Sequence, residues 1–463
     1  MGQCSGKFGS HSSHDLLSNT AWVREVVTGH QKKRRGISKF CNFSFEPVGE
    51  SSDGGEEYHK ITVQFLNSKS QPQSVNWMVI HGPSSPHSPL TSEIKTRRTF
   101  LPDLITFLSS CQYKRAKYLV NIPELIYHEE KMTGQGSSTQ YLVIENIQVT
   151  KKCDPCPPYL VQAGLDLTHL NLVLSTLAQY HAVSIAWKQS LGDDSILDIY
   201  PHLSRPPCSN ISTQRCKDLL ALYHKVLLKK HNQSLPERLE KKLRYVESIS
   251  DCLSEPSEDD MNSVLGTVGL GAVTPLHIAF QVINIKSGSN LHVNSLLSQI
   301  TDDQACAAIS RVPNISFTTI TRDLAAWVFT LANTSVKKYY LLEILHNYAT
   351  TLTNALDLLG VHHEQFGVTF HQFCKHFFKE AELGVLVSIL VSMNDSSEED
   401  INEYLNKNED DTDCDTTEAN PVKTKRISVP LSDHRLNYLE HLLDDIYCFL
   451  TYECRTRDYE VLC

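Results

Sequence analysis

Three glycines crowd into one short stretch of the chain, at Gly266, Gly269 and Gly271. Backbone N–H groups of a glycine-rich turn can hold a phosphate, so this stretch is the first candidate for chemistry. A dinucleotide-binding loop, however, has the order G-x-G-x-x-G and opens a helix after an early strand. Here the spacing is reversed, and Pro275 interrupts the residues that should form the helix. We therefore expect no nucleotide-binding loop of that kind. We interpret the glycines as loop positions at which constraint on the residue type is relaxed.

Cysteine and histidine spacing offers two candidates for metal binding. Cys153 and Cys156 form a lone C-x-x-C pair, whereas a structural zinc site needs a second pair of ligands at a suitable spacing. A rigid proline turn is the simpler interpretation. The other candidate is a histidine-rich stretch made up of His362, His363, His371, Cys374 and His376. Surface or core histidines are the ordinary interpretation there, so we predict no metal site.

The N-terminus carries a separate signal. Gly2 follows the initiator Met and Cys4 lies two residues further on, which resembles a myristoylated and palmitoylated start. Gly6 stands where the consensus prefers Ser or Thr, so the match is incomplete. Stable attachment to a membrane needs a second lipid or a basic patch. A basic run follows at Lys32, Lys33, Arg34 and Arg35. An unmodified tail with a solvated charge run is the alternative.

The overall composition excludes several classes of protein. Of the 463 residues, 41% are hydrophobic and 21% are charged, which is ordinary for a globular protein. The net charge of −10 argues against a nucleic-acid partner, since such binders are usually basic. The longest apolar run, Leu383–Met393, has 11 residues, about half of what a bilayer crossing needs. Because the N-terminus lacks a signal-peptide pattern, we expect a cytoplasmic protein with reduced thiols, peripheral to a membrane if it is acylated.

The order of the expected elements indicates an α+β protein. Strand patterns cluster in the first third of the chain, at residues 40–48, 58–66, 75–83, 119–130 and 139–149. A short helix at 15–28 precedes them and a longer one at 92–110 interrupts them. Beyond residue 150 the pattern is helical, and Asp166 or Thr168 can cap the start of the longest helix. Segregated strands and helices are typical of the α+β class.

One acidic segment stands apart from this pattern. Residues 395–418 hold 11 acidic side chains against a single lysine, and almost no large apolar residue follows Leu405. Such a segment cannot bury enough apolar surface to offset the entropy of ordering it. We predict a disordered insert at about 394–428, followed by a last helix.

Several short motifs occur in a characteristic order. YLVIENIQ, Tyr141–Gln148, runs from an apolar strand into Glu145 and Asn146. Further motifs are a Glu-Ile pair before Leu-Pro, a helix ending in Leu-Ala and His-Ala, and an Asp-Leu pair before an aromatic helix. Their residues are Glu93, Ile94, Leu101, Pro102, Leu177, Ala178, His181, Ala182, Asp323 and Leu324. Over about residues 15–455, this order resembles the ecdysteroid kinase-like family, small-molecule kinases related to choline and aminoglycoside kinases.

The resemblance implies an α+β, protein-kinase-like fold of two lobes. A disordered leader at 1–15 would precede an N-lobe at 16–145, built of an antiparallel sheet and one helix. A mainly helical C-lobe would cover 146–463. Glu145 and Asn146 would stand at the hinge-like positions between the lobes.

The same resemblance places other residues where the family has its chemistry. Phosphoryl transfer needs a lysine on the phosphates, a base for the acceptor hydroxyl, and Asp or Asn ligands for magnesium. His81 falls at the position of the lysine. We align the apolar residues that follow the glycine-rich loop with those that follow the family's catalytic loop. Ala272 then falls at the position of the family's catalytic base, and His277 falls at that of the asparagine that binds magnesium. Ser310 falls at the metal-binding aspartate, and only Glu93, the usual partner of the lysine, is retained.

Losing the lysine, the base and both metal ligands of a concerted site should lower the rate by several orders of magnitude. We therefore predict a catalytically inactive pseudokinase that acts as an interaction module, with no cofactor and an unidentified protein partner. One alternative is an active kinase that uses ATP and magnesium to phosphorylate a hydroxyl of a small molecule such as an ecdysteroid. Another is a carrier that holds a lipid or small ligand in the former acceptor cleft.

Overall fold

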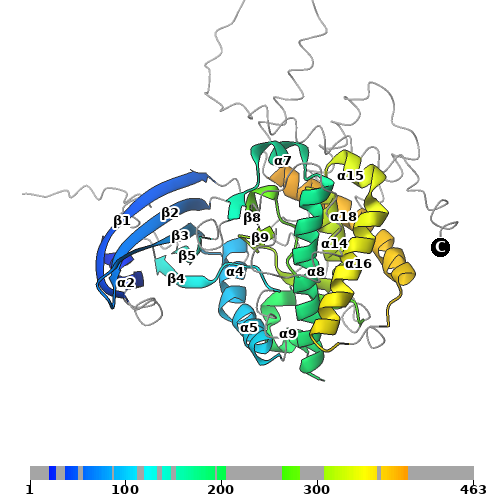
Figure 1. Ribbon diagram of the computed structural model, residues 1–463, viewed down its shortest axis with the longest axis horizontal. Coiled ribbons are helices and arrows are strands. Elements are labelled where there is room, and N and C mark those ends of the chain that lie inside the picture. Colours follow the sequence, from blue (N-terminus) through cyan, green and yellow to red (C-terminus); the bar gives the residue numbers. More distant parts are fainter. Residues whose placement is uncertain are drawn as a thin grey trace, which may run out of the picture. The chain divides into compact units, whose positions relative to one another are not determined.

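The computed structural model describes eleven stretches of the chain (Figure 1): residues 20–27, 37–50, 56–85, 88–111, 119–132, 138–146, 153–192, 195–204, 263–281, 307–361 and 367–394. The chain divides into two compact units. The first comprises Met1–Ser85 and Pro123–Thr150, and the second comprises Pro86–Ile122 and Lys151–Cys463.

In its described residues, the first unit is an antiparallel sheet with one short helix. The sheet has the order β1-β2-β3-β5-β4. Its elements are α2 (Thr20–Val26), β1 (Ile37–Glu50), β2 (Glu57–Asn67), β3 (Pro72–Pro83), β4 (Leu125–Met132) and β5 (Ser138–Glu145). Alternate residues of β2, such as Ile61 and Val63, are buried in one cluster with Trp22 of α2. Because this alternation gives one apolar face, α2 packs on that face, and Trp22 Nε1 donates to Glu129 Oε2 at 2.8 Å.

A tight turn fixes the register of β2 against β3. The side-chain oxygen of Asn67 accepts from the backbone N–H groups of Lys69 and Gln71 at 2.9 and 3.0 Å. This side-chain capping stabilises the turn, in which Ser70 has a φ of 59°. The resulting register sets Glu57 directly opposite His81.

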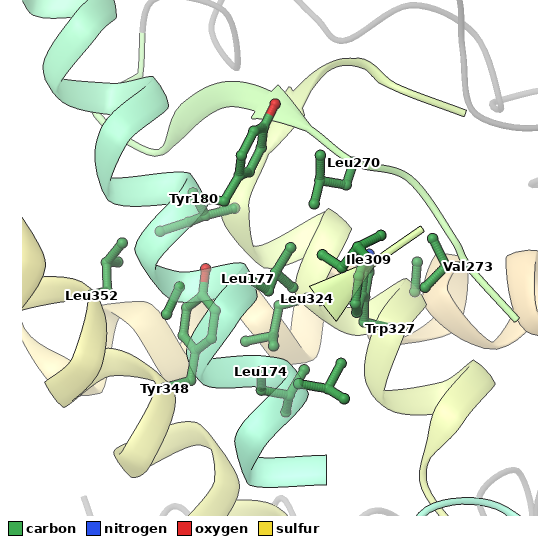
Figure 2. Packing of buried hydrophobic residues seen from close by; sticks show 14 of the residues in the cluster. Leu174, Leu177, Tyr180, Leu270, Val273, Ile309, Leu324, Trp327, Tyr348 and Leu352 are labelled. Carbon is green, nitrogen blue, oxygen red and sulfur yellow. The ribbon is translucent and has the colours of Figure 1, made fainter. Parts of the chain in front are cut away.

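The second unit is mainly helical. In the described residues its helices are α4 (Pro89–Arg98), α5 (Phe100–Ser110), α7 (Pro158–Ala163), α8 (Leu167–Ser190), α9 (Ile196–Ile199), α14 (Ile320–Leu331), α15 (Thr334–Tyr339), α16 (Leu341–Leu358) and α18 (Phe370–Asn394), with 3-10 turns η3 (Pro201–Ser204) and η5 (Pro275–His277). Figure 2 shows Leu177 of α8, Leu324 and Trp327 of α14, and Leu352 of α16 in one buried cluster. Of the two expected caps of α8, the structure uses Asp166, whose side chain accepts from the backbone N–H of His169.

Two small sheets flank a loop at residues 270–277. β7 (Gly266–Gly269) pairs with β10 (Ser316–Thr319), and β8 (Ile278–Gln281) lies between β6 (Cys153–Pro155) and β9 (Ala307–Ile309). The loop therefore leaves one sheet and enters the other, which fixes both of its ends. Figure 2 shows Leu270 and Val273 of the loop in the same cluster as Trp327.

The structure differs from the sequence-based expectation in three places. The expected helix at 92–110 is two helices, which meet at Thr99. The segment at 86–122, which the sequence places with the N-lobe, groups with the second unit because Phe100, Leu101 and Leu104 are part of its core. The expected proline turn at Cys153–Cys156 contains strand β6 instead, because Cys153 pairs with Gln281 of β8.

Neither cysteine of the C-x-x-C pair forms a disulfide, and both are buried. Burial raises the pKa of the Cys156 thiol to about 12, so this thiol is neutral at physiological pH. In the histidine-rich stretch, Cys374 is buried, His371 is exposed, and residues 362–366 lie outside the described residues. The predicted leader, the acidic insert and the last helix also lie outside them. Within the described stretches, no helix is both long and apolar enough to cross a membrane.

Candidate functional site

One buried carboxylate accepts two backbone N–H groups of the loop at 270–277. Asp323 of α14 accepts the backbone N–H of Leu270 on Oδ2 and that of Gly271 on Oδ1, both at 2.9 Å. His181 of α8 approaches Oδ2 with Nε2 at 2.9 Å, and its Nδ1 forms a short hydrogen bond with the hydroxyl of Tyr348. All three side chains are buried. Asp323 thus has a structural task, and its oxygens are occupied by the backbone of the loop.

Gly271 is required by the shape of the same loop. Its φ is +70°, and a Cβ there would lie 2.3 Å from the backbone oxygen of Asn314. Trp327 donates from Nε1 to the carbonyl oxygen of Gly271 at 2.7 Å. A Cβ at Gly269 would lie 2.5 Å from Cγ2 of Thr318. The interpretation of these two glycines as relaxed constraint is therefore wrong, because both permit close packing that a side chain would prevent.

The structure brings together two of the residues expected to replace catalytic ones. Ser310 donates to the carbonyl oxygen of His277 from its backbone N–H at 2.8 Å and from Oγ at 2.9 Å. Ala272 is buried in the same loop, and its carbonyl oxygen accepts from the side-chain amide of Asn314 at 3.2 Å. Neither the segment 263–281 nor the segment 307–319 contains an Asp or a Glu. These segments therefore contribute no carboxylate that could hold magnesium or accept a proton.

Glu93 is retained, but its neighbours are two arginines. The carboxylate is fully buried; Oε1 accepts from Arg97 Nε and Nη2 at 2.9 and 2.8 Å, and Oε2 accepts from Arg311 Nε at 2.8 Å. The backbone N–H of Val312 also donates to Oε1, at 3.2 Å. Burial by itself would raise the pKa of Glu93, but the charges of Arg311 and Arg97 outweigh it and lower the pKa to about 2. Glu93 is thus ionised and saturated within its own unit.

Sequence reasoning missed both arginines, although each gave a signal. Arg97 lies four residues after Glu93, the spacing at which side chains meet on a helix. Arg311 directly follows Ser310, and Arg97 Nη2 also donates to the carbonyl oxygen of Ser310 at 3.2 Å. The network therefore ties the segment around Ser310 to α4.

His81, at the expected lysine position, belongs to a cluster in the first unit. Its Nε2 lies 3.0 Å from Oε2 of Glu57 and 3.0 Å from Nε2 of His59. His59 and His81 are both 3% exposed, whereas the side chain of Glu57 is 42% exposed. Sequence reasoning considered neither Glu57 nor His59.

Glu145 and Asn146 lie at the end of β5. The backbone N–H of Glu145 donates to the carbonyl oxygen of Glu124 at 3.0 Å, and that of Asn146 donates to the carbonyl oxygen of Asn76 at 3.2 Å. Their hinge-like role stays a prediction. The acylation positions Gly2 and Cys4 and the basic run at 32–35 lie outside the described residues.

Comparison with known proteins adds two findings. The sequence profile of the ecdysteroid kinase-like family matches residues 88–361. The solved structure of the microcompartment-associated aminopropanol kinase is similar at 11% identity and a TM-score of 0.30, over 80% of this chain and 99% of that one. A likeness at this level carries no argument about activity or substrate. No curated protein matches the chain.

Proposed function

This chain belongs to the ecdysteroid kinase-like family, with the family's kinase-like two-lobed fold, and we propose that it has lost phosphoryl transfer and acts by binding. The family's small-molecule kinases need a lysine, a base and magnesium ligands to move a phosphoryl group. The observation that carries the proposal is the lack of any carboxylate in 263–281 and 307–319, the two segments that the alignment assigns to this chemistry.

The hydrogen bonds that hold the loop at 270–277 support the proposal, because they are present although the catalytic residue types are not. Asp323 still binds the backbone of Leu270 and Gly271, and Ser310 still meets His277. A neutral residue at Ala272 cannot accept a proton from an alcohol, and the hydroxyl of Ser310 is engaged with a carbonyl oxygen. The chain would therefore keep the shape of the loop without its reactivity.

The environment of Glu93 supports the same conclusion. In the family this residue pairs with the phosphate-contacting lysine, whereas here both oxygens accept from Arg97, Arg311 and a backbone N–H. Freeing Glu93 would leave two buried guanidinium groups without their carboxylate, which is strongly unfavourable. Glu93 is therefore a structural residue in this chain.

A family member without transfer chemistry would work through a protein partner. We place this activity in the cytoplasm, at a membrane surface if Gly2 and Cys4 are acylated and Lys32, Lys33, Arg34 and Arg35 add attraction to anionic lipid. Replacing Gly2 by Ala and fractionating cells tests this part. Unchanged membrane association in the variant would remove acylation from the proposal.

Thermal unfolding with added ligands tests the loss of transfer. A ligand that binds only the folded state raises the unfolding temperature in proportion to the logarithm of its concentration over Kd. We expect ATP with magnesium to give no larger shift than ATP alone. A clear magnesium-dependent shift would favour an active kinase, and stabilisation by apolar ligands without nucleotide would favour a carrier.

A further inference from the structure

Three potential metal ligands meet on one face of the sheet in the first unit. Residues two apart on a strand point to the same face, so Glu57 and His59 of β2 share a face. His81 of β3 lies directly opposite Glu57 in the register and diagonal to His59. The strand pairing alone therefore gathers one carboxylate and two imidazoles.

The three donor atoms are spaced as the ligands of one small cation. The distances are 3.0 Å between the Nε2 atoms of His59 and His81, 3.0 Å from His81 Nε2 to Glu57 Oε2, and 3.5 Å from His59 Nε2 to Glu57 Oε2. Tetrahedral zinc with bonds of about 2.0–2.1 Å to nitrogen and oxygen sets its ligand atoms about 3.3 Å apart. The cluster thus matches one triangular face of such a tetrahedron.

No placement of protons lets His59 Nε2, His81 Nε2 and Glu57 Oε2 all hydrogen-bond to one another. Each Nε2 has one in-plane site, which carries either a proton or a lone pair. With Glu57 as a carboxylate, a proton on His81 leaves the lone pair of His59 facing Glu57, and a proton on His59 leaves that of His81 facing it. Protons on both nitrogens face each other across 3.0 Å. A cation that accepts all three lone pairs removes the conflict.

We propose that Glu57, His59 and His81 bind one zinc ion. Imidazole nitrogen and carboxylate oxygen are common zinc ligands, and two histidines with one glutamate leave a fourth position for water or an anionic oxygen. The half-exposed side chain of Glu57 gives the ion a route from solvent.

Aromatic side chains pack on both histidines of the cluster and restrict the motion of their rings. Phe45 stacks on His59 with ring centroids 4.5 Å apart, and Tyr141 stacks on His81 at 5.5 Å. The two imidazoles lie parallel within 2°, with centroids 5.1 Å apart. Binding therefore requires the rings to turn so that both lone pairs converge on the ion, within aromatic walls that limit other motion.

Competition for zinc in solution tests the site. The full-length chain is titrated with Zn²⁺ against a chromophoric chelator, together with the variants Glu57→Gln, His59→Gln and His81→Gln. The chain holds 21 histidines and 14 cysteines, so the comparison between variants, rather than total binding, reports this site. Replacing His128 of β4 by Gln is the matched control in the same unit. Cobalt(II) in place of zinc distinguishes these ligands from thiolates, which add a charge-transfer band in the near ultraviolet.

We expect one tight equivalent of zinc in the wild type and in His128→Gln, weakened by more than about 10-fold in the three ligand variants. Glu57→Gln changes a half-exposed side chain, so it carries the test if a histidine variant fails to fold. Equal titration curves for wild type and Glu57→Gln, or a thiolate band as the main cobalt signal, would overturn the proposal. Neither outcome decides whether the protein transfers a phosphoryl group, because the zinc titration contains no nucleotide.

Discussion

Arg311 donates from Nε to Oε2 of Glu93 at 2.8 Å, and both side chains are almost completely buried. The two residues lie 218 positions apart in the sequence. Because Arg97 shares the same carboxylate, one negative charge holds two positive ones in the interior of the second unit. The residue that would be expected to serve catalysis therefore contributes to stability.

Replacing Glu93 by Gln should destabilise the protein. The substitution removes the carboxylate that the buried Arg97 and Arg311 side chains both bind, and breaking a buried ion pair costs about 3–5 kcal/mol. Urea unfolding at neutral pH measures the change in the free energy of unfolding. Glu343→Gln, on the exposed face of α16, is the matched control and should unfold like the wild type. Equal stability of Glu93→Gln and Glu343→Gln would contradict a structural role for Glu93.

The stability of the protein should fall at acid pH partly through Glu93. Burial raises its pKa, but Arg311 and Arg97 lower it from 4.5 to about 2 in the folded state. A lowered pKa stabilises the folded state above pH 4.5, and this contribution is lost as the pH falls from 4.5 towards 2. The loss amounts to about 3 kcal/mol. Unfolding measured at several pH values should show a shallower acid slope in Glu93→Gln, and parallel slopes would count against the assignment.

Replacing Gly271 by Ala should be much more harmful than the same change at Gly360. Both glycines have positive φ, at +70° and +85°, but a Cβ meets Asn314 at 2.3 Å in the first case and nothing within 4 Å in the second. Conformational strain alone costs about 1–2 kcal/mol, which is the effect expected for Gly360→Ala. The added clash with the backbone should bring the cost at Gly271 to about 3 kcal/mol or more. Similar losses for the two variants in thermal unfolding would show that the loop is not tightly packed.

Replacing Asp323 by Ala should loosen the loop at 270–277. The change leaves the backbone N–H groups of Leu270 and Gly271 without their buried acceptor, at about 1–3 kcal/mol for each group. Hydrogen exchange followed by mass spectrometry should show lost protection in the peptide that covers this loop. Asp357→Ala, on the exposed side of α16, is the control. Unchanged exchange in Asp323→Ala would mean that the loop is held by other contacts.

Local sequence patterns predicted much of the fold. The apolar periodicity of α8 and α16 and the alternation in β2 are carried by neighbouring residues, so they are visible without the structure. The capping carboxylate of Asp166 was likewise one of two local candidates. The order of short motifs was sufficient to predict the family.

Contacts between distant segments could not be predicted in the same way. The partner of Glu93 lies after Ser310, and nothing near either residue specifies their pairing. The meeting of Glu57 and His81 depends on the hairpin register, which is set by the side chain of Asn67 in the turn. A sequence search that fixed this register first would have found the cluster, since Glu57 and His59 already have the spacing of one strand face.

The affinity for ATP with and without magnesium tests the central claim most directly. The protein is first stripped of bound metal, so that the zinc site does not contribute, and is then titrated with ATP in the two conditions. Without carboxylates in 263–281 and 307–319, we expect the two Kd values to agree within about threefold, if ATP binds at all. Binding that magnesium tightens more than about tenfold, roughly 1.4 kcal/mol, would contradict the loss of the metal site and with it the loss of phosphoryl transfer.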